Sequence, residues 1–403
     1  MLTRNQYLLC TLLVCVAANA ALSQSSMADF QQLLREKASF DEPDFATLQL
    51  NQPVVRLAQT SDKREVAVSG LVNINASAEE FLRSYRDSML RKSNAAILEI
   101  GSFSHEPALA DLEGLTLDTS DIDDLKECVV GDCKIKLSAP MIERFRKEID
   151  WAAPDYQLRV TSLFKEMLLA YIKDYRTRGE AALIQYNDKR DRIKLADEQR
   201  GLSSAAGYVS TVLAGAKSDL QLLEETLVWS KIKFGLKPVI AVNHISIYKR
   251  NSDVGPQVLV ASKQIYANHY FNAFLAFTAF VNVPGAANGS YLVYENRSRA
   301  DGLEGPFGKL KRGIVEKKAV EGLRGIIAQS KASLEGSALT ATTAEFSSRD
   351  SNSWGHRLFG GIRPLLWLLM LSALIALLLL GRRRADTATA SKGKALKPES
   401  VKS

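Results

Sequence analysis

Hydrophobic and polar residues alternate along Val66–Ile74, and this period of two predicts a β-strand. The next residues, Ser77–Glu80, form a capping box because a serine precedes a glutamate by three positions. A capping box in front of an apolar run predicts the start of a helix. A short helix is also expected earlier, over Ala28–Lys37. The chain therefore begins its ordered part with a helix, a strand and a second helix.

A helical period appears after Pro154, where apolar residues recur every three or four positions. They are Val160, Phe164, Leu168, Tyr171 and Tyr175. Gly179 can end this helix, and a further helical stretch is predicted over residues 203–229. Together these segments predict a helical insertion over about residues 138–235.

The character of the sequence changes at Pro238. Three runs rich in β-branched and aromatic residues follow, beginning VIAVNHISIY, QVLVASKQIY and SYLVYENRSR. Turn signals at Gly255-Pro256 and at Ala287-Asn288-Gly289 separate them. We therefore expect an antiparallel meander over residues 238–300.

Residues 305–335 then predict one long amphipathic helix. Its buried stripe would consist of Phe307, Leu310, Ile314, Val320, Leu323 and Ile327. Three internal glycines, Gly313, Gly322 and Gly325, either weaken this helix or let another element pack closely against it. The predicted fold class of residues 24–335 is α+β: an antiparallel sheet with a long C-terminal helix and a helical insertion.

Both ends of the chain carry apolar segments of another kind. Residues 1–20 predict a cleaved signal peptide, with Arg4, the apolar run Tyr7–Ala17 and the small-x-small site Ala18–Ala20. A lipoprotein anchor at Cys15 is the alternative, although the residues before it match a lipobox badly. An exported domain is the favoured interpretation.

Near the other end, Pro364–Leu380 is uncharged over 17 residues, the lower limit for a membrane-spanning helix. Because Arg382–Arg384 follow at once, the tail over residues 382–403 is predicted to be cytoplasmic. Residues 336–361 are rich in Ser, Thr and Ala and predict a flexible stalk. This is the outline of a single-pass type I protein of the inner (plasma) membrane, with a periplasmic or extracellular domain. A processed sorting signal is the alternative for the C-terminal span.

In this topology most of the net positive charge belongs to the predicted cytoplasmic tail. The chain has a net charge of +7, but the tail holds seven Lys or Arg and two Asp or Glu. Once the tail and Arg4 are set aside, the exported part carries only +1. A nucleic-acid partner is therefore not expected, and the basic tail suits anionic lipid headgroups.

Two of the four cysteines, Cys128 and Cys133, remain after signal-peptide cleavage. They flank Val-Val-Gly-Asp, which suits a tight turn, so a disulfide closing a short loop is expected in an exported domain. Their spacing differs from the CxxC of redox sites and the CxxCH of haem sites. No cofactor and no metal site are expected.

Catalytic motifs give little support for an enzyme. The chain lacks G-x-S-x-G and H-E-x-x-H sequences. His244 and His269 lie in ordered-looking runs and are interpreted mainly as structural, with acid–base catalysis as the alternative. Asp121, Asp123 and Asp124 offer oxygen ligands for calcium, but without the glycine and distal glutamate of an EF-hand a solvated acidic loop is favoured.

The element order over Val66–Arg86 and Val239–Glu335 resembles the START-like, helix-grip superfamily. In that superfamily a curved sheet wraps a long helix around an apolar cavity, so the resemblance implies binding of an apolar ligand such as a lipid. The stretches WSKIKFGLKPVIAVNHISIY and ASKQIYANHYFNAFL also look like those of an exported bacterial family of unassigned function.

The run Tyr266–Phe280 is apolar on both alternating faces, which is typical of a strand buried on both sides or lining an apolar pocket. The candidate ligand-binding residues are Tyr266, His269, Tyr270, Phe274, Phe277 and His244. The leading hypothesis is a membrane-anchored, non-catalytic domain that binds an apolar ligand. The alternatives are an envelope structural or protein-interaction domain, and a hydrolase whose site forms only in three dimensions.

Overall fold

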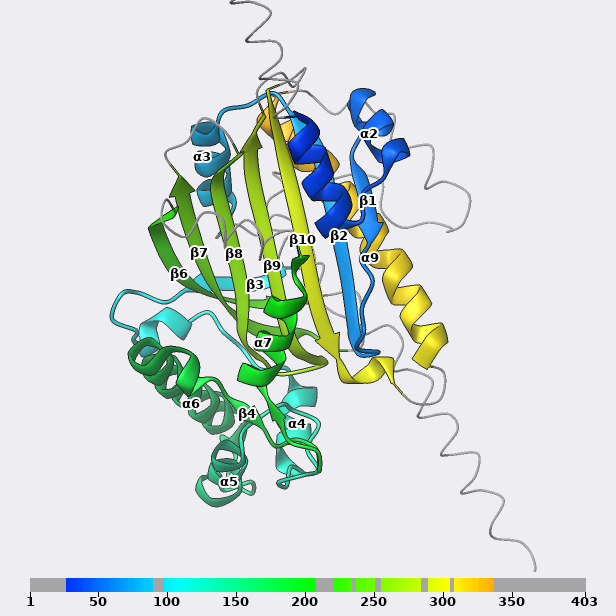
Figure 1. The fold of residues 1–403 in the computed structure, drawn as a ribbon. Coiled ribbons are helices and arrows are strands. Elements are labelled where there is room, and N and C mark those ends of the chain that lie inside the picture. The colour runs from blue at the N-terminus through cyan, green and yellow to red at the C-terminus, as the bar shows by residue number, and fades with distance from the viewer. Residues whose placement is uncertain are drawn as a thin grey trace, which may run out of the picture.

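The computed structural model describes residues 27–89, 97–207, 220–233, 237–250, 255–283, 289–304 and 308–336. Within these ranges the chain is α+β with a large antiparallel sheet, as predicted, and helices cover both faces of that sheet (Figure 1). None of the helices in these ranges is long and apolar enough to cross a membrane. The predicted signal peptide, the transmembrane span and the cytoplasmic tail all lie outside the described residues.

Eight strands form the main sheet. They are β1 (Val54–Leu57), β2 (Glu65–Ile74), β3 (Ile97–Ser102), β6 (Leu220–Ile232), β7 (Val239–Arg250), β8 (Gly255–Ala267), β9 (Phe271–Asn282) and β10 (Ser290–Ala300). Their order is β1-β2-β10-β9-β8-β7-β6-β3, and every neighbouring pair is antiparallel. The predicted meander is confirmed in β7–β10, and the early strand β2 lies beside the last strand, β10.

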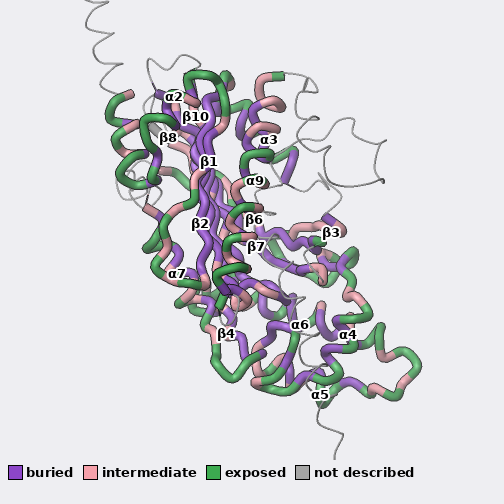
Figure 2. Tube along the Cα trace, turned by 90° about the vertical axis from the view of Figure 1, so that its right-hand side faces the viewer, coloured by how far each residue is buried: buried purple, intermediate pink, exposed green. Residues whose placement is uncertain are grey.

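Both faces of this sheet are covered, and all ten residues of β2 are buried. Because side chains alternate along a strand, Leu71 and Asn73 face one layer of helices whereas Val72 and Ile74 face the other. The register places Tyr291 of β10 directly opposite Asn73. In Figure 2 the strands form a buried layer, and the exposed positions lie mainly on the surrounding helices and loops.

One face carries α3 (Ala78–Met89) and α9 (Gly308–Leu334). The helix α9 lies along β2 and β1, and its buried residues include Val315, Leu323 and Ile327. The predicted stripe is therefore right at Leu323 and Ile327. It is wrong at Leu310, which is exposed because it lies on the side of the helix opposite the buried Val315 and Ala319.

Close packing between α9 and the sheet depends on Gly70 of β2. A Cβ atom there would lie 2.1 Å from Cδ1 of Ile327 and 3.1 Å from Cδ2 of Leu323. By contrast, no atom among the described residues lies within 4 Å of a Cβ added at Gly313 or Gly325. The close approach is made possible by the glycine in the strand, and Gly313 and Gly325 of the helix are not needed for it.

We therefore expect Gly70→Ala to lower the free energy of unfolding by about 1–3 kcal/mol, because the methyl group overpacks a filled core. Gly313→Ala should instead raise it by up to about 1 kcal/mol, because alanine favours the helix and finds open space. Urea unfolding of the full chain measures both changes. Equal effects of the two substitutions would contradict this description of the packing.

The opposite face carries a helix over residues 27–38, α2 (Glu42–Gln49) and the insertion between β3 and β6. The insertion contains η1 (Leu109–Leu112), α4 (Thr119–Lys126), α5 (Ala139–Glu148), α6 (Tyr156–Arg178), η2 (Gly179–Ala182), β4 (Gln185–Tyr186), β5 (Ile193–Lys194) and α7 (Leu195–Ala205). A 3₁₀ turn, η3 (Asp301–Leu303), follows β10. The predicted helix over the α6 region and its end at Gly179 are confirmed.

The predicted helix over residues 203–229 is wrong from residue 220 onward, because residues 220–232 form the strand β6. This segment pairs with β7 on one side and with β3 on the other. Because side chains alternate along β6, Leu227 and Trp229 pack in the core on the side of the insertion, whereas Val228 packs in the core beneath α3 and α9. Pairing with two strands outweighs the helix preference of leucine and glutamate, so the predicted helical insertion does not extend to residue 235.

Candidate functional site

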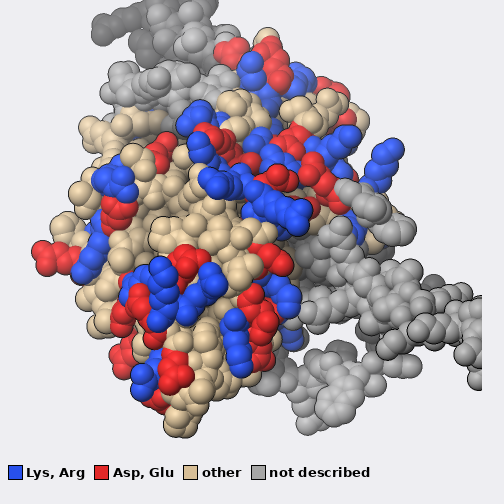
Figure 3. Space-filling view, turned by 90° about the horizontal axis from the view of Figure 1, so that it is seen from below, with Lys and Arg blue, Asp and Glu red and all other residues tan. Residues whose placement is uncertain are grey.

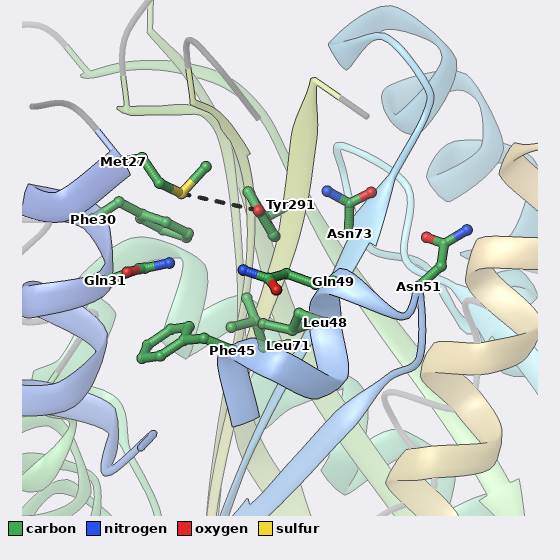
Figure 4. Close-up of a pocket in the computed structure, with 10 residues that line it drawn as sticks. All are labelled: Met27, Phe30, Gln31, Phe45, Leu48, Gln49, Asn51, Leu71, Asn73 and Tyr291. Carbon is green, nitrogen blue, oxygen red and sulfur yellow. Dashed lines mark hydrogen bonds between the residues drawn. The ribbon is translucent and has the colours of Figure 1, made fainter. Parts of the chain in front are cut away.

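A cavity of about 600 Å³ lies where the helix over residues 27–38 and α2 cover the sheet (Figure 4). Its floor is formed by β2 and β10. The lining residues are Met27, Phe30, Gln31, Phe45, Leu48, Gln49, Asn51, Leu71, Asn73 and Tyr291. This volume lies within the range of pockets that hold small ligands.

The position of α2 over the sheet follows from local sequence. Asp41 and Asp44 form a capping box at its start, in which each carboxylate accepts a hydrogen bond from the other residue's backbone N–H. Arg56 of β1 donates to the buried carboxylate of Asp44 at 2.9 Å and to Asp41 at 2.9 Å. The cap that starts the helix therefore also ties it to the edge of the sheet.

One part of the cavity wall is apolar. Phe30, Phe45, Leu48 and Leu71 are buried members of the core on this face. The ring of Phe30 lies 5.2 Å from the ring of Tyr291, measured between centroids. These side chains offer a ligand the kind of surface that holds an acyl chain or another apolar group.

The other part of the wall is polar but neutral. Gln31, Gln49, Asn51 and Asn73 supply four carboxamides, and Tyr291 supplies a phenol. In Figure 4 the amides of Gln31 and Gln49 point toward each other from the two covering helices. Among the described residues that line the cavity, none is charged. Carboxamides both donate and accept hydrogen bonds, so this wall suits uncharged polar groups.

Asn73 is the most constrained of these polar groups, with only 5% of its surface exposed. It lies directly opposite Tyr291 in the sheet, and the Tyr291 hydroxyl donates to Sδ of Met27 at 4.0 Å. Burial raises the pKa of Tyr291, and the neighbouring amide of Asn73 offsets part of that rise. The Oδ1 atom of Asn73 has no hydrogen-bond partner within the described part of the chain.

Cations close to the cavity already have acidic partners. Arg35 lies over the ring of Phe45 and forms an ion pair with Glu42 at 2.5 Å. On the opposite face of the sheet, Lys331 donates to the backbone carbonyl of Asn73 at 2.7 Å and to Glu335 at 2.6 Å. These two cations therefore add no unbalanced positive charge to the neutral wall.

The six residues proposed from the sequence do not meet in one place, and none of them lines this cavity. Tyr266 and Phe277 lie in the core on the side of the insertion, whereas Phe274 lies in the core beneath α3 and α9. Alternation along β9 explains the split, because residues 274 and 277 are an odd number of positions apart. His269 and Tyr270 lie at the turn between β8 and β9.

Tyr266 and His269 both contact the insertion. The Tyr266 hydroxyl donates to the carbonyl of Lys136 at 3.2 Å. His269 is buried, with Nε2 3.0 Å from Oδ1 of Asp121 and Nδ1 3.2 Å from the carbonyl of Lys134. These contacts hold the insertion against the β8–β9 turn, which is a structural role.

The two cysteines and the acidic residues lie close to this turn. Cys128 and Cys133 have their sulfurs 2.02 Å apart, a separation that allows the predicted disulfide. The predicted solvated acidic loop is wrong for Asp121 and Asp124, which are buried and paired with Lys237. No cluster of His, Cys, Asp and Glu that could hold a metal ion is found among the described residues. Seen from this end, acidic and basic side chains are intermixed (Figure 3).

His244 lies in a separate hollow of about 400 Å³ between β7, β6 and α6. Its Nδ1 is 2.9 Å from the hydroxyl of Tyr175, and its Nε2 is 3.3 Å from Oε1 of Glu225. Burial raises the pKa of Tyr175, although the neighbouring Lys263 offsets part of this rise. The phenol therefore stays protonated at neutral pH, which does not favour its use as a nucleophile.

Burial also lowers the pKa of His244 below 6.5, although Glu225 opposes this shift and Lys263 and Arg176 add to it. A histidine that resists protonation in the folded state stabilises the protein above its unfolded pKa and loses that contribution as the pH falls. We therefore expect the wild type to lose more stability than His244→Gln between about pH 7 and about pH 5. Thermal unfolding over this pH range measures the difference. Parallel pH profiles would contradict it.

Sequence reasoning missed the cavity because its lining comes from four separated elements. One signal was present: Asn73 interrupts the apolar run Leu71–Ile74, and a buried asparagine within a strand needs polar partners. Gln31 and Gln49 carry no such signal, since both belong to polar segments of ordinary composition. Comparisons with protein-family models, with curated proteins and with solved structures find no match for this chain.

Proposed function

We propose that the chain is an exported, membrane-anchored protein whose domain binds a small apolar ligand, such as a lipid, without catalysis. The observation that carries the proposal is the cavity of about 600 Å³, with an apolar wall and a neutral polar wall. Sites for small ligands combine these two features, because apolar contacts give affinity and a few polar groups set orientation.

The strand order supports the proposed relationship to the START-like superfamily. An early strand, β2, lies beside the last strand, β10, and the long helix α9 packs on the sheet. The resemblance implied a ligand between the long helix and the sheet. The cavity lies on the opposite face of the sheet. We therefore propose a ligand site that is covered by the N-terminal helix over residues 27–38 and by α2.

Anchoring through Pro364–Leu380 would keep the domain close to a bilayer. A tethered domain meets lipid at a high effective concentration, so even modest affinity suffices for loading. The proposed tether and the proposed cavity therefore support the same function.

Photolabelling tests the proposal directly. The full chain in membranes is exposed to a long-chain alkyl diazirine without a charged headgroup, and labelled peptides are mapped by mass spectrometry. We expect saturable labelling within residues 27–51, β2 and β10, which together line the cavity. Labelling confined to other parts of the domain would count against the cavity as the ligand site.

A further inference from the structure

We propose that the outward side of α9 docks onto an anionic lipid bilayer, so that the domain lies on the membrane in one orientation. This side, called the basic face below, consists of Leu310 and the four lysines around it: Lys309, Lys311, Lys317 and Lys318. It belongs to the face of the sheet opposite the cavity. The inference uses the membrane anchoring of the proposed function and is independent of the cavity and its ligand.

Helical spacing brings these residues to one side of α9. Successive positions of an α-helix are about 100° apart, so all four lysines lie within about 100° of the direction of Leu310. Leu310 has 65% of its surface exposed, whereas Val315 and Ala319 are buried on the opposite side. In Figure 1 α9 runs along β1 and β2, away from α5 and α6 of the insertion. The basic face therefore points into solvent.

The charges on this side of α9 are not balanced within the described part of the chain. Residues 309–318 contain five basic residues and one acidic residue, Glu316, which pairs with Arg312 at 2.6 Å. The four lysines of the basic face form no ion pair among the described residues. Further along the same side, the charges of Glu321 and Arg324 offset each other. Four positive charges therefore remain for an anionic partner.

The position of the lysines at the start of a helix also indicates such a partner. The N-terminus of a helix carries a partial positive charge, which favours acidic residues and disfavours basic ones. The first turn of α9 holds Lys309 and Lys311 and no acidic residue. An anionic surface against this turn would offset the repulsion between the two lysines and the helix dipole.

A bilayer fits the basic face better than an acidic protein does. An exposed leucine flanked by lysines is typical of helices that lie in the membrane interface, where the apolar side chain enters the acyl boundary and the lysines reach the headgroups. The neighbouring β1–β2 loop adds the exposed Lys63, whose backbone carbonyl accepts a hydrogen bond from Arg312 at 3.0 Å.

The proposed anchor lies within reach of this orientation. Helix α9 ends at Leu334, and the proposed span begins at Pro364. A flexible linker of this length has a root-mean-square extension of about 30 Å, and α9 itself is about 40 Å long. The domain can therefore lay α9 along the bilayer to which its own C-terminal segment is anchored.

Quenching by lipid tests the inference on the full chain. Leu310→Cys is labelled with a fluorophore, and the chain is reconstituted into vesicles that contain a lipid with a nitroxide on its headgroup. Leu158→Cys is the matched control, because Leu158 is 69% exposed but lies on α6. The wild-type chain, treated with the same reagent, gives the background. We expect strong quenching at position 310 in phosphatidylglycerol vesicles, and little at position 158 or in phosphatidylcholine vesicles.

Charge variants test the lysines themselves. In Lys309→Gln/Lys311→Gln/Lys317→Gln/Lys318→Gln the ratio of docked to undocked protein should fall at least about tenfold. Docking should persist in a control that replaces four exposed lysines of the insertion with glutamine: Lys126, Lys147, Lys173 and Lys194.

Urea unfolding separates loss of docking from loss of the fold. Because two of the substitutions remove cations from the start of α9, the urea midpoint of the basic-face variant should be unchanged or raised. An unchanged ratio of docked to undocked protein in this variant would overturn the inference, as would an equal loss in the insertion control.

The remaining outcomes are equally distinct. Equal quenching at positions 310 and 158, or quenching at position 310 that does not depend on phosphatidylglycerol, overturns the inference. A label at position 310 that responds to polyglutamate but not to anionic vesicles shows that the face binds an acidic protein instead. If the chain floats with the vesicles without quenching at position 310, only this inference is overturned. If the chain does not float with them, the proposed anchoring is overturned as well.

Discussion

Replacing Lys136 with methionine is expected to lower the free energy of unfolding by about 3–5 kcal/mol. Lys136 has only 3% of its side chain exposed, and its Nζ lies 3.0 Å from Oδ2 of Asp301. The same ammonium donates to Oδ1 of Asn272 at 2.8 Å and lies 3.7 Å from Asp188. Without it, two largely buried carboxylates would lose the cation they share.

The pKa values of Asp301 and Asp188 both depend on the positive charge of Lys136. Burial by itself would raise the pKa of Asp301, but Lys136 and Lys189 together lower it to about 2. Burial raises the pKa of Asp188, and Lys136 opposes that rise. The lowered pKa of Asp301 contributes stability above its unfolded value of 3.8, and this contribution is lost as the pH falls toward 2.

Lys189 provides the matched control, because it pairs with the same carboxylate of Asp301 but has 52% of its side chain exposed. Exposed ion pairs contribute little, so Lys189→Met should change the free energy of unfolding by less than about 1 kcal/mol. Urea unfolding of the full chain, followed by tryptophan fluorescence, compares the two variants. A similar decrease in the free energy of unfolding in both variants would show that burial of Lys136 does not determine how much it stabilises the fold.

The second large effect is expected on ligand binding. Gln31 and Gln49 reach into the cavity from the two helices that cover it. Replacing both with tryptophan would fill the space between the helices with two large rings. We expect saturable photolabelling of the cavity to fall at least about tenfold, which corresponds to about 1.4 kcal/mol of binding free energy.

Gln32→Trp is the control for this variant. Gln32 lies on the same helix as Gln31, but it is exposed and hydrogen-bonds to Glu36 at 3.0 Å. The control adds one equally large side chain outside the cavity and should leave the labelling unchanged. Equal loss in the double variant and in the control would mean that the effect comes from general disturbance of the helix.

Sequence patterns were sufficient for the elements whose signals are local. The alternation before Ile74 and the capping box at Ser77 predicted β2 and α3, and the structure contains both, with Glu80 accepting from the Ser77 N–H at 2.8 Å. The strand β6 was missed, because its leucines and glutamates favour a helix until two neighbouring strands are available to pair with it. A local sequence pattern does not show which distant segments will pair as strands.

The candidate site was harder to predict than the fold. The run Tyr266–Phe280 was predicted to hold ligand-binding residues because it is apolar on both faces. In the structure, residues on both faces pack into the two hydrophobic cores. The cavity instead forms where Met27 and Leu48 from two helices approach Leu71 and Tyr291 from two strands. Only the register of β2 against β10 brings Asn73 and Tyr291 together, and no local sequence feature encodes that register.

Native mass spectrometry of the full chain, released from detergent micelles after expression in membranes, tests the central claim most directly. The account predicts one adduct per chain with the mass of a small apolar ligand such as a lipid, removed by organic extraction and absent from the Gln31→Trp/Gln49→Trp variant. An adduct-free chain after incubation with membrane lipid, or an adduct that the double variant retains, would contradict the proposal that this cavity is a ligand site.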